Sequence, residues 1–555
     1  MKTDSQRPLF FCAIMMILIS VFVQAAVQSS LGTVEVTQVD FSASDGSNIH
    51  ATLQRPSHAS ESHPLPGVVV IHGSLQSKEW LMAFGIELSR RGVVVLTIDA
   101  NGHGNSDDGE GSGTAALNYL ASLDFVNSSS VGLVGHSMGG GIAWNAIGAS
   151  EVRVDAFVLI GSWVSNEANS TYPHNMLVAV GEFDSLSSYP RNLSLLENAF
   201  GTDDVQSDVT YGDFSNGSAR RVVISRTNHL FETIDPLIVA ETVSWILQSL
   251  KTETTDGTAS IDLIYPLWLV GGLTAIMGLI LTVLPLLSVL TPKMIGDIPT
   301  EREEPSKEVG WSWKYLFGTL GLLTFFPLLG AGLMLDSLVP FPQRYGIPIM
   351  TWILGTALFG VILVGLRLGF DSLRRELIDM FSSHNLQGTA RYGLIVAGVF
   401  LWLYLWTVTV DLFFALDFRS FLPGLNDLTY SRAWFVPLYF IVFLPYFAIE
   451  NRLLVASAEG RKRLTSSWTL KTIFAKCLPF VAVIGVQISV GLLTGLPILS
   501  GLLGYSLLFF YAFVPWFGVA ILLSIHSWNV TGESILGPML NALLFAWLLS
   551  TVLAF

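Results

Sequence analysis

The sequence predicts an α/β domain built on a mostly parallel sheet, followed by an all-α polytopic membrane domain of about eight helices. Short strand-like and helix-like segments alternate from residue 33 to about residue 250, and long apolar runs follow to the end. Charge divides the chain at the same place, because residues 31–260 carry 10 Lys and Arg against 26 Asp and Glu, whereas residues 261–555 carry 17 against 16. These patterns indicate an acidic soluble domain and a membrane domain in one chain.

Composition excludes several classes of function for the soluble domain. Its net charge of −16 argues against binding to nucleic acid and against adhesion to anionic lipid headgroups. The two cysteines, Cys12 and Cys477, both lie in apolar segments, so no disulfide is expected in this domain. Histidine and carboxylate spacings typical of metal sites are missing from its sequence, and we expect no cofactor and no metal.

The N-terminal residues 1–27 have the features of an export signal. Lys2 and Arg7 precede an apolar run over residues 9–23, which ends in Gln24-Ala25-Ala26. A basic start, an apolar stretch and small residues predict a cleaved secretory signal peptide. An uncleaved signal anchor is the alternative, and the run is short for a span of about 20 residues. Both interpretations export the domain that follows.

The soluble domain, residues 28–250, shows the strand pattern of a doubly wound sheet. The first two strands are expected to pair at an antiparallel edge, and the later ones are continuous apolar runs typical of strands buried on both faces. The predicted strands are 34–39, 49–54, 67–71, 93–98, 131–134, 156–160, 176–180 and 221–225. The helix-like segments between and after them are 78–91, 114–123, 142–149 and 231–250.

A Gly-x-Ser-x-Gly motif lies between the fifth predicted strand and the helix that follows. Gly135-His136-Ser137-Met138-Gly139 has the form of a nucleophile elbow, in which a tight turn exposes the serine hydroxyl. Small residues two positions before and after the serine allow the backbone to approach closely. A serine hydroxyl is a poor nucleophile unless a base accepts its proton. The motif therefore predicts a catalytic Ser137 only if a histidine and an acid follow.

Three motifs in this order resemble the α/β-hydrolase superfamily over residues 33–250. They are His72-Gly73, Gly102-His103-Gly104-Asn105-Ser106 and the serine motif, and the resemblance is nearest to the serine aminopeptidase, monoacylglycerol lipase and dienelactone hydrolase branches. It implies a catalytic triad in the chain order serine, acid, histidine. Asp184 follows the strand at 176–180 and His229 follows the strand at 221–225, so the resemblance implies Ser137, Asp184 and His229.

Other residues compete for the role of the acid. Glu182 is the nearest alternative to Asp184, and Asp203 or Asp204 are more distant ones. His103 and His136 are expected to be structural, with His103 ordering its loop and His136 pointing away from the nucleophile.

The oxyanion hole is expected to combine two backbone N–H groups. One is that of Met138, directly after the nucleophile, and the other comes from the loop after the strand at 67–71. Ser74 is the predicted second donor, with Leu75 as the alternative, and the His-Gly-Gly-Gly form of some esterases is not found there.

The connection between the strands at 156–160 and 176–180 has only about fifteen residues. Relatives in the superfamily insert a cap over the active site at this position, and this connection is too short for one. The site is therefore expected either to be open or to be covered by another part of the chain. The longer connection at 185–220 is acidic and polar, which predicts a surface loop, with a flap over the site as the alternative.

A polar linker at residues 251–260 leads into the predicted membrane domain, residues 261–555. The run from residue 477 to residue 525 is too long for one span, so a turn near residues 495–501 is expected to divide it. The predicted spans are 263–289, 315–334, 347–368, 392–416, 434–449, 478–496, 502–525 and 535–553.

The basic residues between the spans predict the orientation. If the soluble domain is outside, the inner loops hold 14 Lys and Arg and the outer loops hold 3, as the positive-inside rule requires. The soluble domain and the C-terminus are then exterior to the cell membrane, and the basic loops are cytoplasmic. Asp411, the one carboxylate well inside a predicted span, is expected to lie near the interface or to bond a neighbouring helix.

Two classes of function remain open at this stage. The first is a membrane-tethered serine hydrolase that acts on an ester, thioester or amide at the exterior face, with esterase or lipase activity favoured over peptidase activity. The second is a transporter or channel-like protein whose exterior domain senses or binds a ligand. A combination, in which the spans deliver a lipid-like substrate to the site, is a third. The expected partners are a small-molecule, lipid or peptide substrate and the lipid bilayer, and no oligomeric state is predicted.

Overall fold

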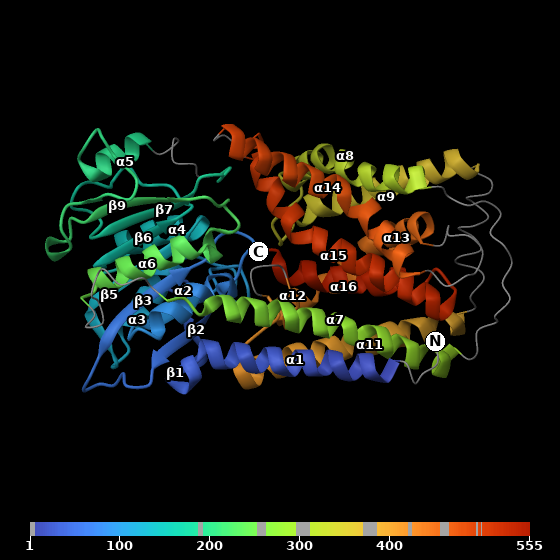
Figure 1. The fold of residues 1–555 in the computed structure, drawn as a ribbon, viewed down its shortest axis with the longest axis horizontal. Helices are drawn as coiled ribbons and strands as arrows, with labels where there is room; N and C mark the ends of the chain where they lie inside the picture. The colour runs from blue at the N-terminus through green and yellow to red at the C-terminus, as the bar shows by residue number, and fades with distance from the viewer. Residues whose placement is uncertain are drawn as a thin grey trace.

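The computed structural model describes residues 6–186, 193–251, 262–295, 311–369, 386–419, 424–455, 465–494, 498–500 and 502–555. Two units lie end to end, as Figure 1 shows. The sheet domain, from β1 to α6, is drawn at the left, and the helical domain, from α7 to α16, is drawn at the right. The N-terminal helix α1 (Gln6–Gln28) runs beside the helical domain and leads into the first strand.

The sheet domain is built on nine strands in the order β1-β2-β4-β3-β5-β6-β7-β9-β8. β1 and β2 pair antiparallel at one edge, which confirms the prediction, and β4, β3, β5, β6, β7 and β9 are parallel. Every residue of β4, β6 and β7 is buried, as their continuous apolar sequence predicts. The strands are β1 (Val34–Ser42), β2 (Asn48–Pro56), β3 (Leu65–Ile71), β4 (Val94–Ile98), β5 (Val126–His136), β6 (Ala156–Ile160), β7 (Met176–Gly181), β8 (Thr210–Tyr211) and β9 (Arg220–Ser225).

Helices cover both faces of this sheet, so the doubly wound prediction is confirmed. α2 and α6 pack together on one face, whereas α3 and α4 pack together on the other. Their bounds are α2 (Met82–Ser89), α3 (Ser112–Ala121), α4 (Met138–Ala149) and α6 (Pro236–Ser249), and a short 3-10 turn, η3 (Lys78–Leu81), precedes α2. The connection predicted as a surface loop at 185–220 contains two elements that the sequence did not reveal, α5 (Leu193–Phe200) and the edge strand β8.

Each of the eight predicted spans corresponds to a helix of the helical domain. Eight helices in the described chain, α1 among them, are long and apolar enough to cross a membrane. The last helix, α16, is shorter and buried almost all round, so it forms the centre of the bundle. The helices are α7 (Tyr265–Ile295), α8 (Trp311–Asp336), α9 (Gly346–Leu368), α11 (Leu386–Phe414), α13 (Phe435–Leu454), α14 (Ser466–Thr494), α15 (Leu502–Thr531) and α16 (Leu536–Val552), with a single turn, α12 (Tyr430–Ala433), before α13.

One ion pair lies deeper in the bundle than the sequence predicted. Glu450 and Lys476 fall between the predicted spans 434–449 and 478–496, but they lie on α13 and α14, and Lys476 Nζ is 2.7 Å from Glu450 Oε1. Both side chains are buried, and Tyr446 also bonds to both. The predicted start of α14 was wrong because it was taken from the apolar run at residue 478, whereas the helix begins at Ser466 and includes the more polar residues before that run.

The helix α1 packs along α7 through close backbone contact. A Cβ atom on Gly271 of α7 would lie 2.7 Å from Gln24 Cγ, and one on Gly278 would lie 3.0 Å from the Ala13 carbonyl oxygen. Small residues that allow such an approach are typical of helix pairs within membranes. At its end, Gln28 donates a hydrogen bond of 2.7 Å to the carbonyl of Phe414 on α11. The structure thus places α1 within the helical bundle.

The sheet domain packs directly against the helical domain, in addition to being joined to it by the predicted linker. That linker lies almost entirely outside the described residues. At the contact, Arg419 of the segment after α11 donates to Glu79 over 3.1 Å and to Asp417 over 2.7 Å. Lys78 Nζ lies 2.6 Å from Glu79 Oε1 and 3.7 Å from Asp99 Oδ2. All five side chains are buried, so charged residues of both domains share one enclosed cluster.

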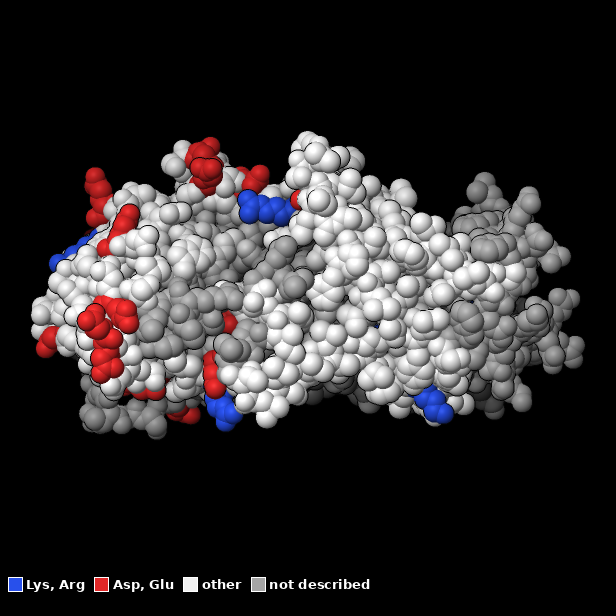
Figure 2. Space-filling model, turned by 90° about the horizontal axis from the view of Figure 1, so that it is seen from above, with Lys and Arg blue, Asp and Glu red and all other residues white. Residues whose placement is uncertain are grey.

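The C-terminus also lies against the sheet domain. The N–H of Phe555 donates 3.0 Å to the carbonyl of Gly102, and Arg432 donates to that carbonyl and to the carbonyl of Leu553. Asp411 accepts a hydrogen bond of 3.3 Å from Gln38 of β1, so it lies at the contact between the domains. Figure 2 shows acidic side chains over the sheet domain and very few charged side chains on the visible face of the helical domain.

Candidate active site

The turn between β5 and α4 holds Ser137 in a strained conformation. Its backbone has φ 52° and ψ −117°, a region that residues with a side chain rarely occupy. A Cβ atom on Gly135 would lie 2.5 Å from the Gly139 carbonyl oxygen, and one on Gly139 would lie 2.2 Å from the Ile71 carbonyl oxygen. The prediction that this turn needs small residues on both sides of the serine is therefore confirmed.

Three residues from three strand ends meet at this turn. His229 Nε2 lies 2.9 Å from Ser137 Oγ, and His229 Nδ1 lies 3.0 Å from Asp184 Oδ2. Asp184 follows β7 and His229 follows β9, and the carboxyl ends of these parallel strands lie at the same edge of the sheet. Asp184 is fully buried, and its Oδ1 accepts the N–H of Leu186 over 2.6 Å. In this arrangement His229 can accept the serine proton while Asp184 orients the imidazole.

The competing carboxylates lie elsewhere. Glu182 is half exposed and is paired with Arg226 at 3.6 Å. Asp203 and Asp204 are exposed, and Asp204 accepts a hydrogen bond from Gln206. The structure therefore brings Asp184, and none of these three, to His229.

The two residues predicted for the oxyanion hole lie beside Ser137. Met138 is the first residue of α4, and the first N–H groups of a helix have no partner within it. The loop after β3 approaches closely, because a Cβ atom on Gly73 would lie 3.0 Å from Ser137 Cβ and Ser74 Oγ lies 3.3 Å from Met138 Sδ. Ser74 and Leu75 both line the cavity at Ser137, and Leu75 has a positive φ of 59°.

A second buried carboxylate, Glu232, lies at the same site and was missed from the sequence. Its Oε1 accepts the Gly181 N–H over 2.7 Å, and its Oε2 lies 3.5 Å from His229 Nδ1 and 3.3 Å from His136 Nε2. Burial, and next the charge of Asp184, raise the pKa of Glu232 well above its ordinary value. Its position three residues after the histidine gave no sequence signal.

The other histidines of the motifs have structural contacts, as expected. His136 lies within 3.0 Å of Gln76 Oε1 and 3.2 Å of the His229 carbonyl, and burial lowers its pKa well below the ordinary value. His103 Nδ1 lies 3.0 Å from the Asn101 carbonyl within its own loop, and burial lowers its pKa to about 3. Both rings are therefore neutral near pH 7.

Three residues at the site are also close enough together to bind a metal ion. His136, His229 and Glu232 each offer a ligand atom, and these atoms lie within 4.8 Å of one another. Two of them already have partners, because His229 Nδ1 faces Asp184 and His136 Nε2 faces the His229 carbonyl. Ligation through His229 Nδ1 would replace its contact with Asp184 and so remove the orienting hydrogen bond.

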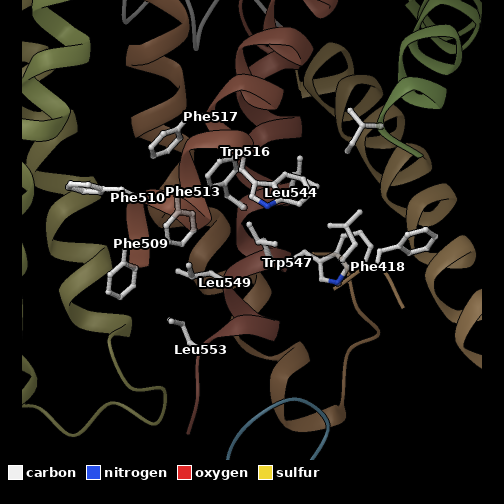
Figure 3. Close-up of a cluster of buried hydrophobic side chains, with 14 of the residues drawn as sticks. Phe418, Phe509, Phe510, Phe513, Trp516, Phe517, Leu544, Trp547, Leu549 and Leu553 are labelled. Carbon is white, nitrogen blue, oxygen red and sulfur yellow. The ribbon is translucent and has the colours of Figure 1, made fainter. Parts of the chain in front are cut away.

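The helical domain covers the site. The cavity at Ser137 has an empty volume of about 590 Å³, and its far wall comes from α15 and the end of α16. These wall residues are Leu508, Phe509, Ala512, Phe513, Val552 and Leu553. Figure 3 shows Phe509 and Phe513 on α15 and Leu553 just after α16, within a larger group of buried apolar side chains. Of the two alternatives, an open site or a covered one, the structure shows the covered one.

Residues on both sides of the acid and the base touch these helices. Asn228 donates 3.4 Å to the Tyr511 hydroxyl of α15, and the Phe231 ring packs edge-on against Tyr511. A Cβ atom on Gly504 of α15 would lie 2.7 Å from Ser185 Oγ. The loops that carry Asp184 and His229 are thus held between the sheet domain and α15.

Part of the sheet domain is similar to a known protein family. Residues 62–189 match the model of the family described as serine aminopeptidase, S33, a segment that includes Ser137 and Asp184 and ends before His229. No curated protein matches the chain.

Solved structures similar to the chain cover less than half of it. An α/β hydrolase from Penicillium sp. sh18 has a TM-score of 0.30 and 12% identity, over 39% of this chain and 99% of its own. An esterase from Pyrococcus furiosus has a TM-score of 0.30 and 12% identity, over 39% and 94%. A CIB-like hydrolase from Thermoplasma acidophilum has a TM-score of 0.28 and 18% identity, over 38% and 98%.

Proposed function

We propose that this α/β hydrolase is a serine hydrolase embedded in the cell membrane, with its sheet domain at the exterior face. The observation that carries the proposal is the chain of hydrogen bonds from Ser137 through His229 to the buried Asp184, at 2.9 Å and 3.0 Å. The apolar helices support the membrane location. The excess of basic residues in the loops that the sequence predicts to be inner supports the orientation.

The reaction is acyl transfer to water through an acyl-enzyme. Ser137 Oγ attacks the carbonyl carbon of an ester, thioester or amide while His229 Nε2 accepts its proton. The N–H groups of Met138 and Ser74 stabilise the oxyanion. His229 then donates the proton to the leaving group, and a water molecule that it activates releases the acid. Asp184 stabilises the imidazolium that forms in each half of the reaction.

The alternative of a transporter with a sensing domain receives less support from the structure. Its sequence signal was Asp411, which lies at the contact between the domains and bonds Gln38. Two other buried charged residues of the bundle, Glu450 and Lys476, pair with each other, and Glu450 also accepts a hydrogen bond from Tyr446, so this pair does not indicate a polar path for transport. A strained serine with a histidine and an acid in line favours an enzyme.

A fluorophosphonate probe tests the proposal on the full-length protein. The wild type is expected to be labelled, and labelling is expected to be lost in Ser137→Ala and in His229→Ala, because the first removes the nucleophile and the second its base. Glu182→Gln, which changes an exposed carboxylate two residues from Asp184, serves as the matched control and should be labelled normally. Labelling that persists in Ser137→Ala would refute the nucleophile.

A further inference from the structure

A second cavity lies next to the one at Ser137 and continues away from the serine. It has an empty volume of about 420 Å³ and lies between the loops of the acid and the base and the helices α14 and α15. His229, Leu230 and Leu508 line both cavities, so the two adjoin at the catalytic histidine. Its other walls include Ile488 and Leu507, and its polar lining comes from Ser185, Asn228, Gln487 and Tyr511.

A third hollow, on the outside of the bundle, adjoins the second. It is a groove between α8 and α14 with an empty volume of about 1000 Å³, lined by residues that include Tyr315, Thr319, Ala482 and Val486. Gln487 lines both this groove and the second cavity. The three hollows thus form one series, from the outer surface of α14 to Ser137.

The surface around the groove is the one that faces lipid if the helices cross a membrane. Val481, Val486 and Leu492 on α14, and Ile498 after it, are large apolar side chains that are about half exposed. Exposed apolar side chains on helices of this length are expected in contact with acyl chains. The groove therefore opens toward the hydrocarbon of the bilayer and not toward water.

Gln487, which lines both the groove and the second cavity, is hydrogen-bonded to the backbone of Leu499. Gln487 Nε2 donates to the Leu499 carbonyl over 3.1 Å, and the Leu499 N–H donates to Gln487 Oε1 over 2.9 Å. The Leu499 carbonyl also lies 3.1 Å from the position of a Cβ atom on Gly504, which lines the second cavity. Both polar atoms of the Gln487 amide are thus bonded to one backbone residue at the place where the two hollows adjoin.

We propose that this series of hollows binds the acyl chain of a membrane lipid, which enters from the bilayer between α8 and α14 and passes Gln487 to bring its ester carbonyl to Ser137. The inference rests on the proposed function and names its substrate class, a lipid ester. The apolar walls fit the chain, and Ser185, Asn228 and Tyr511 supply polar groups in the second cavity, beside the loops of the acid and the base, for the ester and the alcohol. In the reaction the ester C–O bond breaks, the alcohol leaves with the proton from His229, and water releases the fatty acid.

A bifunctional probe tests the proposal on the full-length protein in lipid nanodiscs. The probe is a long-chain alkyl fluorophosphonate with a diazirine near the end of its chain. Reaction at Ser137 tests the proposed function, and mass spectrometry after illumination maps where the chain lies. Crosslinks are expected on the walls of the second cavity and of the groove, at Ile488, Leu507 or Val486.

The two failures are distinguishable in this experiment. If the probe does not react with Ser137, the proposed function is wrong. If it reacts but the crosslinks lie outside α8, α14 and α15, the serine hydrolase stands and the lipid passage is overturned.

A variant that fills the groove provides a second measurement. Ala482→Trp is expected to slow the hydrolysis of a p-nitrophenyl palmitate in the nanodisc by about tenfold or more, while hydrolysis of water-soluble p-nitrophenyl acetate stays unchanged. Leu394→Trp, on an exposed position of α11 outside the groove, is the matched control. Palmitate hydrolysis at the wild-type rate in Ala482→Trp would contradict the passage. Equal loss on both esters would also count against it, because the groove would then not select for the chain.

Discussion

At the scale of single residues, two carboxylates only two positions apart have opposite environments. Asp184 is fully buried and faces His229, whereas Glu182 is half exposed and faces Arg226. β7 ends at Gly181, and the chain turns back there through the hydrogen bond from the Asp184 N–H to the Gly181 carbonyl. The turn therefore decides which carboxylate enters the site.

This difference yields a prediction for catalysis. Asp184→Asn is expected to lower kcat by about 10⁴-fold, because an amide no longer holds the imidazole in the required tautomer. Glu182→Gln is the matched control and is expected to keep the wild-type kcat. Steady-state hydrolysis of p-nitrophenyl acetate measures both, and equal losses in the two variants would contradict the assignment of the acid.

Glu232 gives a prediction for stability against pH. Its folded pKa is raised above the ordinary 4.5, so between these two values the folded state holds a proton that the unfolded state has released. The free energy of unfolding therefore falls as pH rises from 4.5 through the raised pKa. Glu232→Gln carries no titrating proton and is expected to lose less stability over that range.

Thermal unfolding of the purified protein from pH 4.5 upward measures this effect. The wild-type Tm should fall more steeply than that of Glu232→Gln, while Glu241→Gln, on the surface of α6, should follow the wild type. Parallel Tm curves for the wild type and Glu232→Gln would show that the carboxylate is already ionised when folded.

At the scale of elements, the sequence left open whether α1 is a cleaved signal peptide or an uncleaved anchor. The contacts of Gly271 and Gly278 with α1, and the bond from Gln28 to α11, give it the environment of a permanent bundle helix. A cleaved segment would leave the surface of α7 at these glycines uncovered. Cleavage after residue 27 stays a prediction from the sequence, and the packing favours the anchor.

An intact N-terminus is accordingly expected in the purified protein. Mass spectrometry or an epitope tag before residue 6 measures it, and Gly271→Leu should lower Tm by displacing α1, because its new side chain would collide with Gln24. Gly148→Leu, where a Cβ atom meets nothing within 4 Å, is the control for the loss of glycine. A mature protein that begins near residue 28 would contradict the anchor.

The helices and strands themselves were largely predictable. Periodicity and continuous apolar runs predicted the parallel strands and, in the part of the chain that the structure describes, the long apolar helices after residue 261, since each depends on residues close in sequence. α5 and β8 were missed because their polar sequence resembles a loop, and β8 is held only by pairing to the edge of β9. The start of α14 was missed because its first turns contain Lys476, whose charge is matched by a residue on another helix.

At the scale of the whole molecule, the two domains are one unit around a buried charge cluster. Arg419 of the helical domain meets Glu79 of the sheet domain, and Glu79 directly precedes Trp80, which lines the cavity at Ser137. Removing one member of a buried ion pair leaves the other uncompensated. The packing of the helical domain over the site and the stability of the site are therefore expected to depend on the same contact.

Arg419→Met is expected to destabilise the full-length protein by about 3–5 kcal/mol, since Glu79 and Asp417 lose a buried partner. Arg153→Met is the matched control, because that arginine is mostly exposed and its pairing with Asp155 should contribute no more than about 1 kcal/mol. Unfolding of the detergent-solubilised protein measures both. A loss in Arg419→Met as small as in Arg153→Met would show that the cluster does not hold the domains together.

The sequence by itself determined the α/β fold, the elbow at Ser137, the order of the three residues and the eight apolar helices, because each is written in local pattern or in spacing along the chain. Only the tertiary structure decided that α15 and α16 cover the site, that Glu232 adjoins His229, and that hollows with shared lining residues lie between α14 and Ser137. Periodicity shows which face of a helix is apolar, but not what that face meets. Such contacts join residues hundreds of positions apart, and only the packing of the two domains fixes them.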